Sequence, residues 1–241
     1  MTDYAVHTEK LGKRFGDFEA VKNLNLSVHR GEIFGFLGAN GAGKTTAIRM
    51  LCGLLMPTSG AGYVAGFDIY RQAERIKQRI GYMSQKFSLY EDLTVDENIE
   101  FYGGVYGLPR SELHQKREKL IAELGLRNQR SALTGALPLG FKQRLALSCA
   151  LLHEPEIIFL DEPTGGVDPD ARRNFWGLIY QLAEQQRTVF VTTHYMDEAE
   201  YCQRVSIMYQ GEIVALDTPE ALKRKFEKAT MQEVFIHLVD R

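Results

Sequence analysis

The sequence lacks any hydrophobic run long enough to cross a membrane and any excess of charge of one sign. No apolar stretch approaches the roughly 20 residues that a transmembrane helix needs, and no basic-then-apolar leader opens the chain. The 29 lysines and arginines nearly balance 31 aspartates and glutamates, which gives a net charge of −2. This balance argues against a protein held on nucleic acid or on anionic lipid mainly by basic residues. We expect a cytoplasmic protein with no nucleic-acid partner.

Cysteine is equally scarce. Cys52, Cys149 and Cys202 are scattered without the paired spacing of a disulfide framework or a zinc site, so we predict buried or half-buried free thiols in a reducing compartment. The 44% hydrophobic and 25% charged residues are ordinary for a globular protein. A chain of 241 residues is long enough for a sizeable core that needs no metal or disulfide to support it.

Short apolar runs alternate with helical patterns, which is typical of an α/β fold. The run Ile157–Leu160 is wholly apolar, as expected of a strand buried on both faces of a parallel sheet. From about Val95 to Leu152 the pattern is mainly helical, and we assign the helical subdomain to about residues 86–155. We therefore predict one domain over residues 1–241, with a catalytic α/β core of residues 1–85 and 156–241 interrupted by a helical subdomain. Strand patterns cover residues 4–8, 24–28, 33–37, 63–67, 80–83, 157–160, 188–193, 205–209 and 213–216, and helical patterns include 45–55, 72–78, a helix beginning near 141, 175–182 and 231–238.

A glycine-rich segment joins a predicted strand to a predicted helix. Its residues complete the phosphate-loop pattern G-x-x-x-x-G-K-[ST]: Gly38, Ala39, Asn40, Gly41, Ala42, Gly43, Lys44 and Thr45. The glycines let backbone N–H groups converge on phosphate oxygens, and the start of the helix adds its positive end. We expect Lys44 to bridge the β- and γ-phosphates and the Thr45 hydroxyl to reach magnesium. The alternative, a tight turn with Lys44 as surface charge, is disfavoured by the complete motif.

Polar residues also follow the ends of predicted strands, where ligands of α/β proteins gather. Ile157–Leu160 leads to Asp161, expected to hold magnesium or its water shell, and to Glu162, expected to polarise an attacking water. His194 and Gln85 end two further strands and could contact the γ-phosphate, the water or the metal. Each of these residues alone has a plainer reading as a loop edge or a structural side chain. Four strand ends together form a candidate site.

The order and spacing of these segments resemble the ATP-binding cassette (ABC) ATPases over essentially the whole chain. The phosphate loop, extended to Thr46, matches Walker A, and residues 157–162 match Walker B with its catalytic glutamate. Gln85 matches the Q-loop, Asp168 the D-loop and His194 the switch histidine. The resemblance implies a P-loop NTPase core with an N-terminal antiparallel β-subdomain and an inserted helical subdomain.

The resemblance also assigns ligands. It implies an ATPase that binds ATP through residues 38–46, holds Mg²⁺ with Thr45, Gln85 and Asp161, and uses Glu162 and His194 in catalysis. Phe15 occupies the position of the aromatic residue that stacks on adenine, although it could instead be a packed strand residue.

One motif departs from the family pattern. Where most members have Leu-Ser-Gly-Gly-Gln, this chain has Leu137, Pro138, Leu139, Gly140 and Phe141. In the family this signature loop clasps the γ-phosphate held by the opposite subunit. Proline offers neither a hydroxyl nor a backbone N–H, and each lost hydrogen bond to a charged group costs about 1.5–3 kcal/mol. We expect impaired contact with the partner's ATP, and hence a preference for a second cassette whose signature loop is unaltered.

Residues 83–90 and 193–200 resemble ABC exporters of the ABC-2 type. The resemblance implies a separate ABC-2-type transmembrane subunit, which would hold this chain at the cytoplasmic face of the inner membrane. Phe87, Leu89 and Tyr90 would then contact that subunit, or else belong to the local core. The rival functions are a low-turnover, nucleotide-dependent clamp or regulatory cassette, and an ABC protein that acts on ribosomes or DNA.

Overall fold

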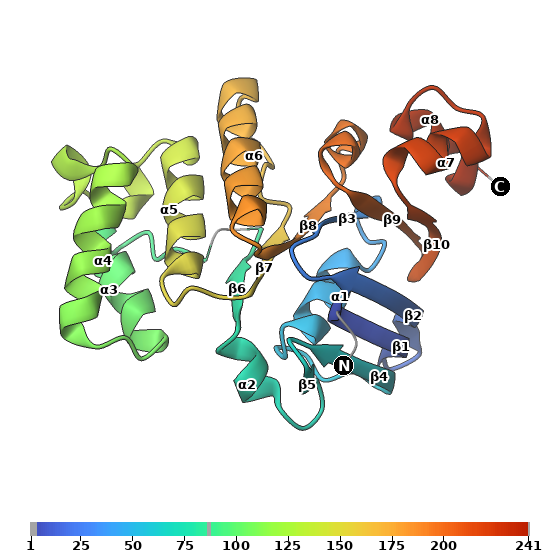
Figure 1. The fold of residues 1–241 in the computed structure, drawn as a ribbon, viewed down its shortest axis with the longest axis horizontal. Helices are drawn as coiled ribbons and strands as arrows, with labels where there is room; N and C mark the ends of the chain where they lie inside the picture. Colours follow the sequence, from blue (N-terminus) through green and yellow to red (C-terminus); the bar gives the residue numbers. More distant parts are fainter. Residues whose placement is uncertain (1–3, 86–87, 241) are drawn as a thin grey trace.

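Two β-sheets and a group of helices make up residues 4–85 and 88–240, the part of the chain that the computed structural model describes (Figure 1). The smaller sheet is antiparallel and has the strand order β2-β1-β4-β5. Strand β2 alternates buried and exposed positions in its second half, which suits a sheet with only one face on the core, whereas irregularities in the pairing of β1 interrupt its alternation. The strand bounds are Tyr4–Phe15 (β1), Phe18–His29 (β2), Ser59–Val64 (β4) and Phe67–Asp68 (β5).

The larger sheet has six strands in the order β10-β9-β3-β8-β7-β6. The strands from β9 to β6 are mutually parallel, and β10 pairs antiparallel with β9 across the turn at Gln210–Gly211. Every residue of β3, β7 and β8 is buried, as expected of apolar strands covered on both faces. The bounds are Ile33–Leu37 (β3), Ile80–Met83 (β6), Ile157–Asp161 (β7), Thr188–Thr193 (β8), Arg204–Tyr209 (β9) and Glu212–Asp217 (β10).

Helices cover both faces of the larger sheet. Helix α1 lies between the two sheets, where Phe34, Phe159 and Phe190 form the centre of one core cluster (Figure 1). The opposite face packs against α6 and α8 through a second cluster that includes Phe175 and Trp176. The bounds are Lys44–Leu51 (α1), Ala73–Lys77 (α2), Pro169–Glu184 (α6), Pro219–Phe226 (α7) and Met231–Val239 (α8), with a 3₁₀ helix at Met196–Tyr201.

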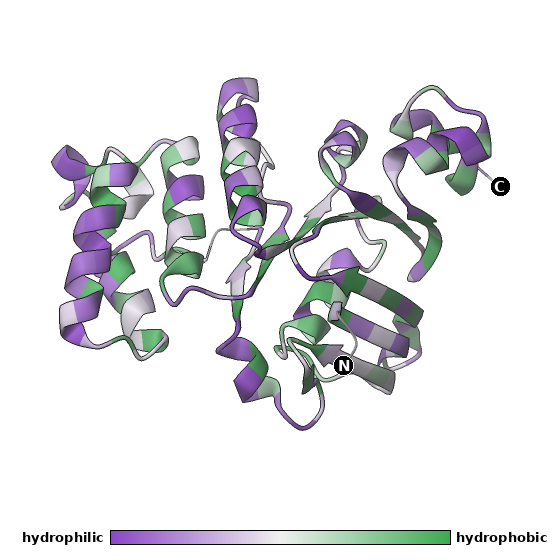
Figure 2. Cartoon of the chain, in the orientation of Figure 1, coloured by the Kyte–Doolittle hydropathy of each residue, from purple (hydrophilic) through white to green (hydrophobic). Residues whose placement is uncertain are grey.

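The predicted helical insertion is present between β6 and β7. It consists of α3 (Val95–Val105), α4 (Arg110–Glu123) and α5 (Leu139–Leu151), with 3₁₀ turns at Arg127–Gln129 and Thr134–Ala136. It has a small core cluster of its own. Figure 2 shows that hydrophilic residues dominate α4, whereas the central strands are largely apolar. Because α4 buries a single residue, Ile121, apolar packing against its neighbours adds comparatively little to its stability.

Helix α5 is fixed to the larger sheet at its carboxyl end. A Cβ atom on Gly81 would lie 2.4 Å from the Ala150 carbonyl oxygen, so only glycine allows β6 to approach the helix this closely. Just beyond the helix, His153 Nε2 lies 2.9 Å from the Ile80 carbonyl oxygen, and the His153 ring stacks on Tyr106 at 3.7 Å. The other end of α5 carries the altered signature loop.

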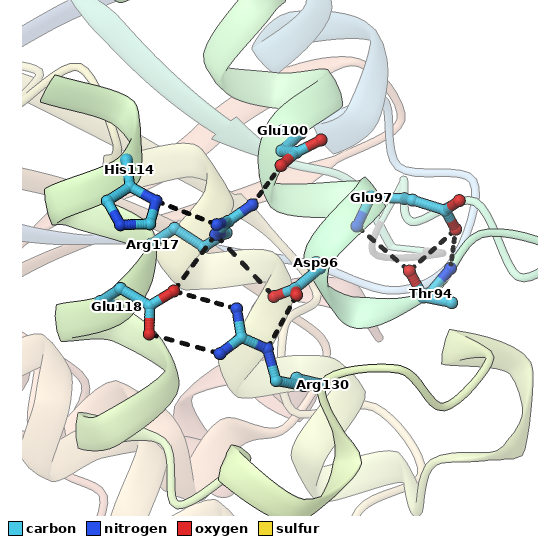
Figure 3. A network of polar contacts seen from close by, with 8 residues as sticks. All are labelled: Thr94, Asp96, Glu97, Glu100, His114, Arg117, Glu118 and Arg130. Carbon is cyan, nitrogen blue, oxygen red and sulfur yellow. Dashed lines mark hydrogen bonds and ion pairs between the residues drawn. The ribbon is translucent and has the colours of Figure 1, made fainter. Parts of the chain in front are cut away.

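A polar network ties the insertion together (Figure 3). Arg130 donates to Asp96 Oδ2 of α3 at 2.8 Å and to Glu118 Oε1 of α4 at 2.9 Å. At the start of α3, the Thr94 hydroxyl accepts the Glu97 N–H and the Glu97 carboxylate accepts the Thr94 N–H, which forms a capping box. The backbone N–H of Thr94 and then its hydroxyl hold the pKa of Glu97 below its usual range.

The structure corrects several boundaries. The strands predicted at 4–8 and 24–28 are longer, because they extend as the β1–β2 hairpin. The helix predicted to reach residue 55 ends at Leu51, where Gly53 adopts a φ of 66° and stops it. The helix expected near residue 141 begins at Leu139. Helix α7 was not predicted, although Thr218 caps it and Pro219 occupies its first turn. The three cysteines are buried and free, as predicted.

We predict that Thr94→Ala lowers the free energy of unfolding by about 1 kcal/mol, because the N–H groups at the start of α3 lose their cap. Because the folded-state pKa of Glu97 is depressed, its contribution is complete above its unfolded pKa, about 4.3, and is lost as the pH falls through the folded value. Urea unfolding followed by circular dichroism between pH 3 and 7 measures both effects. Thr230→Ala, in the matching box of α8, is the control for a cap outside the insertion. An unchanged midpoint in Thr94→Ala would contradict the prediction.

Candidate active site

The phosphate loop connects β3 to α1 and depends on its glycines in different ways. Gly43 has a φ of 106°, and a Cβ there would lie 2.4 Å from the Ala20 carbonyl oxygen. At Gly38 a Cβ would lie 2.5 Å from the Met208 carbonyl oxygen, whereas Gly41 needs glycine only for its φ of 80°. Gly38 and Gly43 thus allow close packing on β9 and β2, while Gly41 and again Gly43 adopt a positive φ. The resulting loop exposes Ala39, Asn40 and Gly41 at the amino end of α1.

Lys44 is the first residue of α1 and is only 4% exposed. Its ammonium group donates to the carbonyl oxygens of Gly38 at 2.7 Å and Ala39 at 3.1 Å, and lies 3.2 Å from Glu162 Oε1. The alternative reading of Lys44 as surface charge is therefore wrong. A buried ammonium group needs such partners because desolvation of an unpaired charge is costly.

Asp161 ends β7 and is 1% exposed. The hydroxyls of Thr45 and Thr192 donate to its Oδ1 atom at 3.3 Å and 2.7 Å. Burial raises the pKa of Asp161, while these two hydrogen bonds oppose the rise. A carboxylate and a hydroxyl side by side are hard oxygen donors of the kind that Mg²⁺ takes, and a cation would favour the charged form of Asp161. The donor set therefore fits a magnesium ion.

Glu162 brings three strand ends into contact. Its Oε2 atom accepts a hydrogen bond from Gln85 Nε2 at 3.0 Å and lies 3.1 Å from His194 Nδ1, while Oε1 pairs with Lys44. Its backbone has a φ of 49°, which is unusual for a glutamate, and its N–H donates to the Thr192 hydroxyl at 2.9 Å. The Glu162 side chain is 9% exposed, and its Oε1 atom faces Lys44 at the end of the phosphate loop.

The strand-end prediction is correct in its geometry. Because β6, β7, β8 and β3 are parallel and adjacent, their carboxyl ends bring Gln85, Glu162, His194 and Lys44 together. Gln85 was expected to contact the metal together with Asp161 and Thr45. In the structure its amide nitrogen donates a hydrogen bond to Glu162. Its metal role stays a prediction.

Other predicted residues lie outside this contact group. The Phe15 ring is 49% exposed, with Lys13 Nζ 5.0 Å from its centre, so the alternative of a packed strand residue is wrong. Asp168 caps α6 by accepting the Ala171 N–H at 2.9 Å. The structure thus gives Asp168 a local structural contact, and its D-loop role stays a prediction.

The signature loop forms the amino end of α5. Leu137 is buried in the core of the helical insertion, Pro138 takes the cap position, and Leu139 is 40% exposed. Phe141 packs against that core, with Arg144 over its ring at 4.6 Å. Neither Pro138 nor the first turn of α5 supplies a capping side chain. The exposed part of the loop is therefore apolar.

The residues that follow the Q-loop differ in how far they are buried. Leu89 is half-buried against two core clusters, which fits the local-core alternative, whereas Tyr90 is 45% exposed and its ring lies 4.6 Å from Phe101. Phe87 lies outside the described residues. Among the described residues no helix combines the length and apolarity that a membrane span requires.

Sequence reasoning missed Thr192. It is wholly buried, donates to Asp161 and accepts the Glu162 N–H, so it fixes both acidic residues at once. The only signal in the sequence is the Thr192–Thr193 pair at the end of an apolar strand. That signal does not show which neighbouring strand the hydroxyls face.

The fold and the phosphate loop define a P-loop nucleoside triphosphatase. The chain belongs to the ABC transporter family, whose sequence model matches residues 21–165. It is 50% identical over 239 residues to the "Probable multidrug ABC transporter ATP-binding protein YbhF" of Escherichia coli (strain K12), covering 97% of this chain but 41% of YbhF. The chain therefore spans less than half of that relative.

Two further comparisons agree with this family. The "Linearmycin resistance ATP-binding protein LnrL" of Bacillus subtilis (strain 168) is 38% identical over 214 residues, which cover 88% of this chain and 69% of LnrL. A dimeric ATP-binding cassette, solved in a post-hydrolysis state with ADP and Pi, superposes with a TM-score of 0.80 at 26% identity. That match covers 88% of this chain and 98% of the solved one.

We predict that Lys44→Ala weakens ATP binding by about 10- to 100-fold, because charge-assisted hydrogen bonds to phosphate are lost. Titration with a fluorescent ATP analogue measures the effect. Lys116→Ala is the matched control, since Lys116 is also a lysine paired with carboxylate, here from Glu112 and Glu154, but it lies in the helical insertion. Equal affinities of the Lys44→Ala protein and the wild type would show that Lys44 does not contact the nucleotide.

Proposed function

We propose that this chain is the ATP-binding and ATP-hydrolysing subunit that powers an ABC exporter, of the ABC-2 type and multidrug-like. The observation that carries the proposal is the Glu162 carboxylate, held at the end of β7 by Lys44 on one oxygen and by Gln85 and His194 on the other. The names of YbhF and LnrL support the export part of the proposal.

The phosphate loop and α1 bind the triphosphate. Backbone N–H groups and the positive end of α1 attract the phosphate oxygens, and Lys44 exchanges carbonyl contacts for the β- and γ-phosphates. Thr45 and Asp161 would hold Mg²⁺, and Gln85 is proposed to contact it as well. When bound, the ion would supply positive charge that offsets the negative charge of the phosphates. The exposed ring of Phe15 offers adenine a stacking surface.

Glu162 acts as the general base. It accepts a proton from the attacking water, whose oxygen bonds to the γ-phosphorus as the bond to the β–γ bridging oxygen breaks, leaving ADP and phosphate. His194 and Gln85 both contact Oε2, so they fix the direction in which the carboxylate faces the water. His194 contacts the γ-phosphate in the same arrangement.

Two cassettes close on the nucleotide in this proposal. ATP binds between the phosphate loop of one cassette and the signature loop of the other, and hydrolysis releases them. The closure drives a separate ABC-2-type transmembrane subunit, so the chain works at the cytoplasmic face of the inner membrane. Tyr90, whose side chain is exposed, contacts that subunit. The post-hydrolysis dimer of the solved relative supports the pairing of cassettes.

The second cassette is proposed to differ from this one. Pro138 and the exposed Leu139 replace the hydroxyl and glycine that serve the opposite ATP, which favours a partner with an unaltered signature loop. A tandem protein would provide such a partner, and we propose that this chain corresponds to the second nucleotide-binding domain of a YbhF-like tandem protein. The 41% of YbhF that it covers is consistent with one half of such a protein.

The same loop supports a second candidate, a nucleotide-dependent clamp or regulatory cassette with low turnover. Its apolar surface at Pro138 and Leu139 offers the partner's phosphate no side-chain donor. Against it stands the assembled group around Glu162, which a cassette that only binds ATP would not need.

We predict that Glu162→Gln keeps ATP binding but loses turnover by at least about 100-fold, because the general base is absent. The steady-state ATPase rate and nucleotide affinity of both proteins measure this, and ATP should trap the variant as a dimer in gel filtration. Normal turnover in Glu162→Gln would refute the catalytic assignment.

We also predict that the variant Pro138→Ser with Leu139→Gly raises the ATPase rate of the isolated chain by about tenfold, the equivalent of 1.4 kcal/mol. Rates are measured against protein concentration, because a site completed by a second copy gives a rate that rises faster than linearly. An unchanged rate would show that the natural loop is competent. The preference for a different second cassette would then be wrong.

A further inference from the structure

Beside the Glu162 group lies a second buried cluster that the proposed chemistry does not use. Glu198 is wholly buried, and its Oε1 atom accepts a hydrogen bond from the Thr164 hydroxyl at 2.6 Å. Arg172 Nε lies 3.6 Å from the same oxygen, and Arg172 Nη1 lies 3.7 Å from Asp197 Oδ2. We refer to Thr164, Arg172 and Glu198 as the Glu198 cluster.

Each member of the cluster lies a short distance along the chain from a residue of the proposed site. Thr164 is two residues after Glu162, Arg172 is four residues after Asp168, and Glu198 is four residues after His194. The loop after β7, the first turn of α6 and the 3₁₀ helix after β8 therefore meet at one carboxyl group. Thr164, Arg172 and Glu198 contact one another through polar atoms, so packing of the apolar core does not explain why they lie together.

A second contact path runs in parallel through aromatic rings. The Arg172 guanidinium lies 4.2 Å from the centre of the Tyr195 ring, and the Tyr195 ring lies 4.2 Å from the His194 ring. Arg172 thus touches both the chain segment that carries His194 and the carboxyl group that holds Thr164. Any shift of the α6 amino end changes its contacts with both.

The cluster is poorly arranged for stability alone. Among the described residues, Glu198 Oε2 and Arg172 Nε are buried without a hydrogen-bond partner. Such atoms are rare in folded proteins, and a buried ion pair is often no more stabilising than apolar residues of similar volume. The Glu198 cluster is therefore better explained by the chain segments that it connects than by a contribution to the free energy of folding.

We propose that Glu198 and Arg172 are positioning residues that couple His194 to Glu162 and to the loop that ends at Asp168. Through Thr164 and Tyr195, the cluster holds the general base, the histidine and the D-loop in one mutual arrangement. Contact of His194 with phosphate is then communicated to the start of α6, where the second cassette is proposed to pack. The inference rests on the proposed function of the same site.

Glu198→Gln tests the coupling, because glutamine keeps the size of the side chain but not its charge toward Arg172. We expect kcat to fall about 10- to 100-fold, as for misplaced catalytic groups, while KM for ATP stays within about twofold because the phosphate loop is untouched. We also expect ATP to trap fewer dimers when Glu198→Gln is combined with Glu162→Gln. A parallel loss of kcat and ATP affinity would overturn the proposal in favour of a general structural role.

Glu32→Gln is the matched control. Glu32 is also a buried glutamate beside an arginine, with Oε1 3.4 Å from Arg204 Nε and without a hydrogen-bond partner, but it precedes β3 at the opposite edge of the sheet. We expect it to lower the melting temperature and leave kcat unchanged. Equal effects of Glu32→Gln and Glu198→Gln on kcat would overturn the inference.

Thr164 supplies a second test in case Glu198→Gln fails to fold. Thr164→Val removes the hydroxyl without changing the shape of the side chain and should lower kcat, whereas Thr164→Ser should restore it. Unchanged kcat in Thr164→Val overturns the inference while the wild type still hydrolyses ATP. Absence of ATP hydrolysis by the wild type alone and with a second cassette would instead refute the proposed function.

Discussion

The buried ion pair between Lys44 and Glu162 is the interaction on which the site depends. The ammonium group and the carboxylate come from different strand ends, and both are more than nine-tenths buried. Because an unpaired buried charge is costly, the ion pair favours the positions that the phosphate loop and the end of β7 take toward each other. The antiparallel sheet and α1 contribute indirectly, since they bury the loop from which Lys44 extends.

Much of this arrangement could be predicted because it follows from local patterns. The wholly apolar run at β7 predicts a strand covered on both faces, and the phosphate-loop motif fixes the strand and helix on either side of it. Parallel strands place their carboxyl ends at one edge, so Asp161, Glu162 and His194 could be assigned to one site from the sequence. The resemblance to the ABC family supports that assignment, and the comparisons confirm the family itself.

The contacts between those ends could not be predicted. Thr192 and Glu198 take their roles from the side chains that neighbouring strands and loops place beside them, over separations of about 30 residues. The sequence likewise does not show that Gln85 donates to Glu162, because that contact depends on the course of the chain after β6. Helix α7 was not predicted for a different reason. Its eight residues include two buried ones, Pro219 and Leu222, which are too few to give a helical pattern of apolar residues.

The attachment of α5 to the sheet has a mechanical consequence. The close approach at Gly81 and the contact between His153 and Ile80 attach the carboxyl end of the helix to β6. Leu139 stands at the other end, near which Gln143 donates to the Pro163 carbonyl oxygen at 2.7 Å. Thirteen helical residues extend about 20 Å, so a tilt of about 10° around the fixed end would carry Leu139 through about 3 Å. That distance separates a formed hydrogen bond from a broken one. A small rotation of α5 about its carboxyl end is therefore enough to make or break the contacts of the signature loop.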